Sequence, residues 1–112
     1  YLIVDVRDED FIGGNIIGAV NILAHEFNRT PSEFAPLLSL PRRLIFHCAL
    51  SQVRGPKSAN TYVREVLPQN IENPGQQVFV LTGGFSAWQL RYGKDARLTE
   101  KYDEELWRNM DY

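Results

Sequence analysis

The clearest pattern in the sequence is a set of short runs rich in apolar and β-branched residues. Three of them occupy residues 2–6 (Leu-Ile-Val-Asp-Val), 43–47 (Arg-Leu-Ile-Phe-His) and 77–81 (Gln-Val-Phe-Val-Leu). All three are predicted strands, and the first, which is almost wholly apolar, is typical of a strand that is buried on both faces. A weaker run at 18–22 follows a pair of glycines and predicts one more short strand.

Helical patterns separate these runs. Residues 30–33 (Thr-Pro-Ser-Glu) combine an N-cap hydroxyl, a proline at the first helical position and a glutamate two positions later. This capping box predicts a helix that continues to about Leu40, with Phe34, Leu37 and Leu38 on its buried face. Further helices are predicted over residues 56–67, 85–92 and 102–110.

Strands that alternate with helices predict an α/β domain with a parallel sheet and helices on both faces. The 112 residues fit one compact domain, which we expect to span 1–112 with both termini trimmed, because the chain opens on Tyr1 directly before an apolar run. Ligands bind such sheets at the carboxyl ends of the strands. The loop after residues 43–47 lies there, so the topology alone indicates where a site should be.

Composition excludes several classes of protein. A net charge of −2, from 12 Lys and Arg against 14 Asp and Glu, gives no reason to expect a nucleic-acid partner. No apolar run approaches the roughly 18 residues of a membrane span, so we expect no membrane partner. Cys48 is the only cysteine, which excludes an internal disulfide and favours a reducing compartment, the cytoplasm or the nucleus. One cysteine and two separated histidines make no ligand set, so we expect no metal.

The chemistry is expected in residues 47–56, which read His-Cys-Ala-Leu-Ser-Gln-Val-Arg-Gly-Pro. Cys48 ends a buried strand, and Arg54 stands where a helix begins. Six consecutive amides can turn inward around a point above the sulfur and form an anion-binding nest. They belong to Ala49, Leu50, Ser51, Gln52, Val53 and Arg54.

Neighbouring residues strengthen this interpretation. The Arg54 guanidinium offers a bidentate clamp for a tetrahedral oxyanion, and Gly55 lets the backbone approach closely. Residues 42–64 hold five cations and no Asp or Glu, an environment that favours a nucleophilic thiolate. The alternative is that Cys48 is a small buried hydrophobe. The strand before it, the spacing to Arg54 and the Gly-Pro helix start would then coincide by accident.

The motif His47-Cys48-x5-Arg54-Gly55-Pro56 resembles the active loop of rhodanese-fold dual-specificity phosphatases of the cell-division-cycle type. It is equally similar to the loop of eukaryotic glutathione-dependent arsenate reductases, which share that scaffold. The resemblance extends to residues 4–7 (Val-Asp-Val-Arg), to 13–21 and to the Gly-Gly-aromatic turn at 81–88, and so covers 2 to about 92. It implies a rhodanese-like three-layer domain with a central, mostly parallel sheet flanked by helices. The family's usual strand and helix before the first apolar run are not found.

The resemblance implies a phosphatase that acts on phosphotyrosine or on mixed protein phosphosites. Cys48 would attack phosphorus to form a phosphocysteine, the loop amides and Arg54 would stabilise the equatorial oxygens, and water would release phosphate. His47 is expected to support the loop without touching substrate, and Ser51, where the relatives also carry serine, to hydrogen-bond within it. The loop from Cys48 to Arg54 has seven residues, the phosphatase length, whereas sulfurtransferases of the family have one residue fewer.

One departure from the family concerns the general acid. The cell-cycle phosphatases carry glutamates where this chain has Ala49 and Val53. The acidic run Asp8-Glu9-Asp10 is expected to be a solvated loop. Without a strong acid, aryl phosphates should react far better than alkyl phosphates.

The same departure favours arsenate reduction as the alternative function. Cys48 would form an arsenate adduct, and glutathione followed by glutaredoxin would complete the reduction, so no resident cofactor is expected. A sulfurtransferase and an inactive phosphate-binding module are further alternatives.

Other polar and aromatic residues suggest structural roles. By resemblance, Asp5 and Arg7 pair with each other; His25 is expected at the surface and Trp88 in the core. The oligomeric state stays open. The helix at 102–110 is expected to be a solvated face, with self-association or partner binding through Leu106, Trp107 and Met110 as the alternative.

Overall fold

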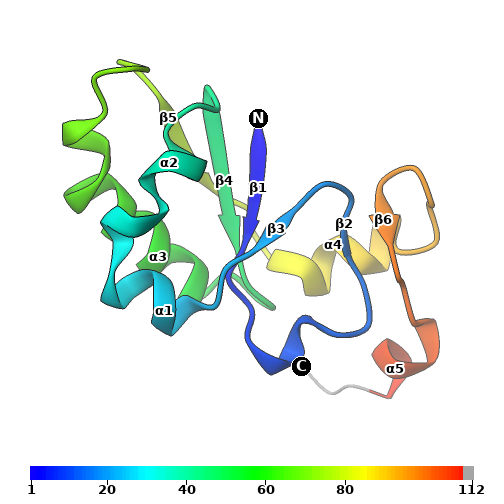
Figure 1. Ribbon diagram of the computed structural model, residues 1–112. Coiled ribbons are helices and arrows are strands. Elements are labelled where there is room, and N and C mark those ends of the chain that lie inside the picture. Colours follow the sequence, from blue (N-terminus) through cyan, green and yellow to red (C-terminus); the bar gives the residue numbers. More distant parts are fainter. Residues whose placement is uncertain (110–112) are drawn as a thin grey trace.

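A computed structural model of the chain describes residues 1–109 and shows a central four-stranded sheet in which every pair of neighbours is parallel (Figure 1). The strand order is β3-β1-β4-β5. The strands are β1 (Leu2–Asp5), β3 (Val20–Asn21), β4 (Arg43–His47) and β5 (Gln77–Val80). β1 and β4 are direct neighbours, and their register pairs Asp5 with His47 at the carboxyl ends. The predicted sheet is confirmed, although its edge strand β3 is shorter than the predicted run.

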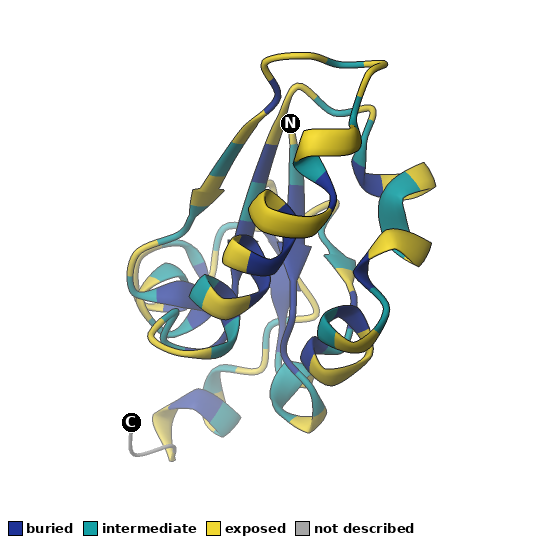
Figure 2. Cartoon of the chain, turned by 90° about the vertical axis from the view of Figure 1, so that its left-hand side faces the viewer, coloured by how far each residue is buried: buried dark blue, intermediate teal, exposed yellow. Residues whose placement is uncertain are grey.

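Helices cover both faces of this sheet, which gives three layers (Figure 1). They are α1 (Ala24–Arg29), α2 (Ala35–Leu38), α3 (Arg54–Glu65), α4 (Gly84–Tyr92) and α5 (Glu104–Arg108). One buried cluster, around Phe27, Phe46 and Tyr62, fills the space between the sheet and α1, α2 and α3. A second, around Ile3 and Phe85, lies under α4. Figure 2 shows the resulting pattern, with buried central strands behind helices whose outer surfaces are exposed, whereas the residues of the edge strand β5 are exposed or intermediate.

The predicted helix over residues 30–40 is wrong in its start, and its predicted buried face is confirmed for Phe34 and Leu38 but wrong for Leu37. The Thr30 hydroxyl donates to the Glu26 carbonyl oxygen and so closes α1, a helix that the sequence did not predict, instead of capping a new one. A 3-10 turn, Pro31–Phe34, follows at once and leads into the four-residue α2. Leu38 is fully buried, but Leu37 is 47% exposed.

The segment after α4 packs back onto the amino-terminal part of the chain. The short strands β2 (Asn15–Ile16) and β6 (Thr99–Glu100), neither of them predicted, pair antiparallel. The predicted helix at 102–110 shortens to α5, and Met110 lies outside the described residues. The expected solvated face is wrong for Trp107, which packs against Phe85 and donates its indole N–H to the Gly13 carbonyl oxygen. Of the helices within residues 1–109, none has the length and apolar character needed to cross a bilayer.

Candidate active site

The loop between β4 and α3 encloses a small cavity above the cysteine sulfur. Its volume is roughly 180 Å³, and its lining residues are Cys48, Ala49, Leu50, Gln52, Val53 and Arg54. Cys48 is only 3% exposed, and its Sγ accepts a hydrogen bond from the Gly55 amide at 3.3 Å. A Cβ at Gly55 would lie 3.2 Å from the His47 Cα, so the predicted close approach of the backbone is present. The structure therefore brings together the residues that the spacing singled out.

Two backbone carbonyls of this loop accept hydrogen bonds from α4. The carbonyl oxygens of Cys48 and Ala49 accept hydrogen bonds of 3.0 and 2.9 Å from the amides of Phe85 and Ser86, at the start of α4. Within residues 1–109, no group accepts a hydrogen bond from the amides of residues 49–54. Six consecutive donors are thus available to an anionic ligand.

Ser51 shapes the middle of the loop. Its φ of +55° lies in the left-handed region, which a residue other than glycine adopts only where its surroundings compensate the strain. The Cys48 amide donates to the Ser51 hydroxyl at 3.4 Å, which confirms the predicted hydrogen bond within the loop.

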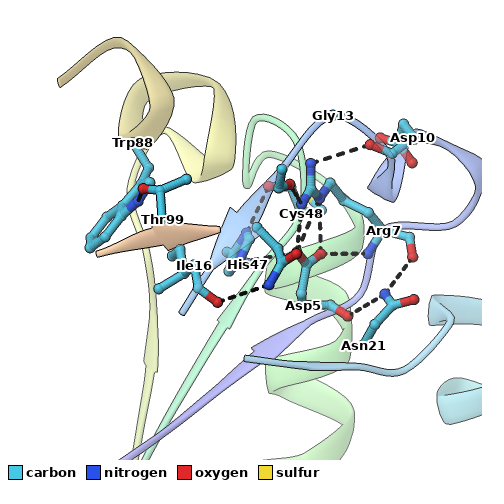
Figure 3. A network of polar contacts seen from close by, with 12 residues as sticks. Asp5, Arg7, Asp10, Gly13, Ile16, Asn21, His47, Cys48, Trp88 and Thr99 are labelled. Carbon is cyan, nitrogen blue, oxygen red and sulfur yellow. Dashed lines mark hydrogen bonds and ion pairs between the residues drawn. The ribbon is translucent and has the colours of Figure 1, made fainter. Parts of the chain in front are cut away.

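His47 lies beneath the loop in a buried polar network (Figure 3). Its Nδ1 is 3.0 Å from the Cys48 carbonyl oxygen, and its Nε2 is 3.5 Å from Asp5 Oδ2. Burial lowers the pKa of His47, and this effect outweighs the opposite effect of the Asp5 carboxylate. The imidazole is therefore neutral at pH 7, and Nδ1–H is the donor to the Cys48 carbonyl. His47 does not line the cavity, in agreement with its predicted supporting position.

Asp5 and Arg7 pair as the resemblance implied. Arg7 is fully buried, and its Nε and Nη2 donate to the Asp5 carboxylate at distances of 2.8 to 3.1 Å. The guanidinium also lies over the Phe85 ring, 4.3 Å from its centroid. This pair fixes the end of β1 beside the end of β4.

The expectation of a solvated acidic loop is wrong for Asp8 and Asp10, because both carboxylates contact Arg54. Asp10 receives hydrogen bonds of 2.8 Å from Nη1 and 2.6 Å from Nη2, and Asp8 receives one of 3.4 Å from Nη1. The hydrogen bonds from Arg54 lower the pKa of Asp10, and those to Asp10 raise the pKa of Arg54. The cationic segment around Cys48 is therefore partly neutralised by a different part of the chain.

The remaining predicted positions lie outside the cavity. His25 is exposed on α1, as expected, with its Nδ1 3.7 Å from Asp8 Oδ1. Trp88, on α4, is half-buried against the cluster around Ile3 and Phe85, and it donates its indole N–H to the Thr99 hydroxyl at 2.8 Å. Within residues 1–109, no three side chains of His, Cys, Asp or Glu gather in a group that could hold a metal ion.

Comparison with known proteins agrees with this geometry. A family model described as a rhodanese-like domain matches residues 1–91. This chain belongs to the rhodanese-like family. One curated relative of this rhodanese-like chain is the dual specificity phosphatase ibp1 of Schizosaccharomyces pombe, 38% identical over 90% of this chain and 83% of its own length. Another is arsenate reductase 2.2 of Oryza sativa subsp. japonica, 35% identical over 79% of this chain and 68% of its own length.

A solved structure supports the same assignment. It is titled as a yeast protein tyrosine phosphatase of the rhodanese family, and it superposes on this rhodanese-like chain with a TM-score of 0.80 at 33% identity. The match covers 95% of this chain and 79% of the yeast protein. The fold and the family that the sequence motifs implied are confirmed.

Proposed function

We propose that this rhodanese-like protein is a cysteine-dependent protein phosphatase that acts on phosphotyrosine or mixed phosphosites, with Cys48 as the nucleophile. The observation that carries the proposal is the seven-residue loop from Cys48 to Arg54, whose amides lack acceptors in the described chain and whose cavity opens above the sulfur. The relatives named as phosphatases support it.

The mechanism follows from the groups around the cavity. The Cys48 thiolate attacks phosphorus in line, the bond from phosphorus to the ester oxygen breaks, and the alcohol leaves. Loop amides and Arg54 stabilise the charge on the three equatorial oxygens. Water then attacks the phosphocysteine, which releases phosphate and restores the thiolate. The cavity has only the apolar Ala49 and Val53 where a carboxylic acid would protonate the leaving group, so phenols should leave better than aliphatic alcohols.

Hydrolysis of p-nitrophenyl phosphate tests this proposal. Cys48→Ser removes the nucleophile and should abolish turnover, and Arg54→Ala should lower kcat/KM by about 10²–10³, the usual cost of losing an oxyanion donor. Arg29→Ala is the matched control, because Arg29 is an exposed cation of α1 that lies outside residues 42–64 and does not line the cavity. Hydrolysis that survives Cys48→Ser would contradict the proposal.

Arsenate reduction is the second candidate, favoured by the relatives named as arsenate reductases and by a loop with a single cysteine. Arsenate would condense with the Cys48 thiolate and lose water. Two external thiols, glutathione and then glutaredoxin, would supply the two electrons and end as a mixed disulfide, while arsenite leaves. Arsenite that appears only with both thiols and with Cys48 present would favour this reaction over hydrolysis.

Two simpler assays distinguish the remaining alternatives. Formation of thiocyanate from thiosulfate and cyanide would favour sulfur transfer, and phosphate binding without turnover would favour a binding module. Each reaction of Cys48 requires a free thiol, so we place the protein in a reducing compartment, the cytoplasm or the nucleus.

A further inference from the structure

The guanidinium of Arg54 is only partly occupied by its carboxylate partners. Of its five N–H groups, both on Nη1 and one on Nη2 point to the carboxylates of Asp8 and Asp10. Among the described residues, none accepts a hydrogen bond from Nε–H or from the second hydrogen of Nη2. These two donors lie on the same edge of the planar group. They form the parallel pair that matches two oxygens of a tetrahedral anion.

Asp10 is itself held in place from the core. The buried Arg7 donates from Nη1 to the Asp10 carbonyl oxygen at 3.2 Å (Figure 3). Its Nη2 donates to the Gly14 carbonyl oxygen at 2.8 Å. Asp5 fixes the other side of the Arg7 guanidinium. A continuous series of polar contacts therefore runs from the end of β1 to the Asp10 backbone, and its carboxylate continues the series to Arg54.

We propose that Asp10 is a positioning residue for the oxyanion reaction at Cys48. The Asp10 carboxylate binds the end of the Arg54 guanidinium, formed by Nη1 and Nη2. The side edge, formed by Nε and the second hydrogen of Nη2, is then left to bind the substrate oxygens. The inference rests on the proposed function only for the identity of the substrate, because a phosphoryl group and an arsenate group would both accept hydrogen bonds from this edge of Arg54. It also accounts for the presence of a carboxylate beside an anion site.

The opposite effect, repulsion of the substrate by the Asp10 carboxylate, is the smaller one. The side chains of Arg54 and Asp10 are 31% and 25% exposed, and a partly solvated pair of this kind changes an affinity by at most about fivefold. A misplacement of about 1 Å in a catalytic group costs about 10²-fold in rate. Loss of Asp10 should therefore lower activity.

Substitution of Asp10 tests the proposal through the kinetics of p-nitrophenyl phosphate. Asp10→Ala should lower kcat/KM by about 10- to 100-fold, by analogy with the range found when groups that orient the ligands of metal ions are removed. Asp10→Asn, which keeps one acceptor, should lie between Asp10→Ala and the wild type. Glu9→Gln is the control, since Glu9 is an exposed carboxylate of the same 3-10 turn, Glu9–Phe11, and should keep wild-type kinetics.

A double-mutant cycle separates positioning from a merely structural role. In an Arg54→Ala background, Asp10→Ala should have no further effect, because its action passes through Arg54. An equal loss in both backgrounds would overturn the proposal, and so would a rise in kcat/KM in the Asp10→Ala protein.

Binding of inorganic phosphate and of arsenate to Cys48→Ser protein, measured by calorimetry, provides a readout without turnover. Asp10→Ala should weaken binding of both anions in that background. Weaker binding combined with no phosphatase activity in the wild type would support the positioning and refute the proposed function. Full phosphatase activity of the wild type, combined with anion binding that Asp10→Ala leaves unchanged, would refute the positioning role and support the proposed function.

Discussion

His47 is a buried, neutral base directly beneath the reactive cysteine. Its ring nitrogen Nδ1 bonds the Cys48 carbonyl oxygen, and its side chain has no solvent exposure. The nearby Asp5 carboxylate is already paired with Arg7, so it compensates little of the cost of charging the imidazole. The folded protein therefore binds a proton at His47 more weakly than the unfolded chain does.

This asymmetry predicts a loss of stability in mild acid. Unfolded histidine titrates near pH 6.5, and the folded pKa of His47 is lower, so its contribution to stability is complete above pH 6.5 and is lost as the pH falls through the folded pKa. Urea denaturation between pH 7.5 and 5 should show a free energy of unfolding that declines toward acid. Asp10 contributes little to the pH dependence in this range. Its pKa is lowered from 3.8, so the stability that it contributes is lost only below that pH.

Two variants identify the residue responsible. His47→Asn keeps a donor for the Cys48 carbonyl but does not titrate, and its decline should be shallower than that of the wild type. His25→Asn removes an exposed histidine and should keep the wild-type slope. Parallel declines in the wild type and His47→Asn would show that His47 is not the group involved.

The sequence predicted that Cys48, Arg54 and the loop amides lie together, because all of them belong to one continuous loop. It did not place Asp8 and Asp10, whose contacts with Arg54 span 46 and 44 residues. Those contacts depend on β1 lying next to β4, which brings together the loops that follow the two strands. The acidic run by itself does not indicate that Arg54 lies beside it in the fold.

At the scale of elements, α4 acts as a support for the catalytic loop. Its first amides bind the carbonyl oxygens of Cys48 and Ala49, which leaves the amides of the loop free for a ligand. Gly84 permits this approach, since its φ is +57° and a Cβ there would lie 2.5 Å from the Ala49 carbonyl oxygen and closer still to that of Cys48. No other residue type fits this position without moving the loop.

Replacement of Gly84 should therefore damage both stability and activity. We expect Gly84→Ala to cost roughly 1–2 kcal/mol for the left-handed backbone and about 1–3 kcal/mol more for overpacking against the loop. Gly75→Ala is the matched control. Gly75 also has a positive φ, +86°, but no atom lies within 4 Å of the position of its Cβ, so only the backbone cost applies. Urea denaturation and p-nitrophenyl phosphate turnover measure both effects, and equal results for the two variants would contradict this account.

Strands were predictable where the sequence has an apolar run of several residues, and burial alone did not decide it: β2 is buried but was not predicted, and β5 was predicted although none of its residues is buried. The strands of the main sheet were predicted because their runs are apolar and short, whereas β2 and β6 have two residues each and pair across more than 80 positions of sequence. The capping box at residues 30–33 contains the right residue types, but the Thr30 hydroxyl bonds the helix before it. Local patterns do not distinguish a hydroxyl that closes one helix from one that opens the next.

At the scale of the whole molecule, the segment beyond the family match completes the second face of the domain. Residues 92–109 contribute β6 and α5, which return to the Gly13 turn and to Phe85. Trp107 is 6% exposed and is the large aromatic residue of this contact. It is thus part of the core and not available as a surface for self-association.

Removal of this side chain should lower global stability. Trp107→Ala should cost about 3–5 kcal/mol, the usual effect of truncating a buried aromatic residue. Leu90→Ala, on the 82% exposed Leu90 of α4, should change the free energy of unfolding by less than about 0.5 kcal/mol. Thermal and urea denaturation measure the free energy of unfolding of both variants. A mild effect of Trp107→Ala would show that α5 is dispensable for the fold.

The pairing of β1 with β4 has a consequence for how this protein is made. A ribosome delivers the carboxylate of Asp10 44 residues before the cation of Arg54, and the two meet only when β4 has added to the open side of β1, before β5 is synthesised. The loop is then still without the amides of α4 that bind the carbonyl oxygens of Cys48 and Ala49, so the first turnover should follow the synthesis of α4.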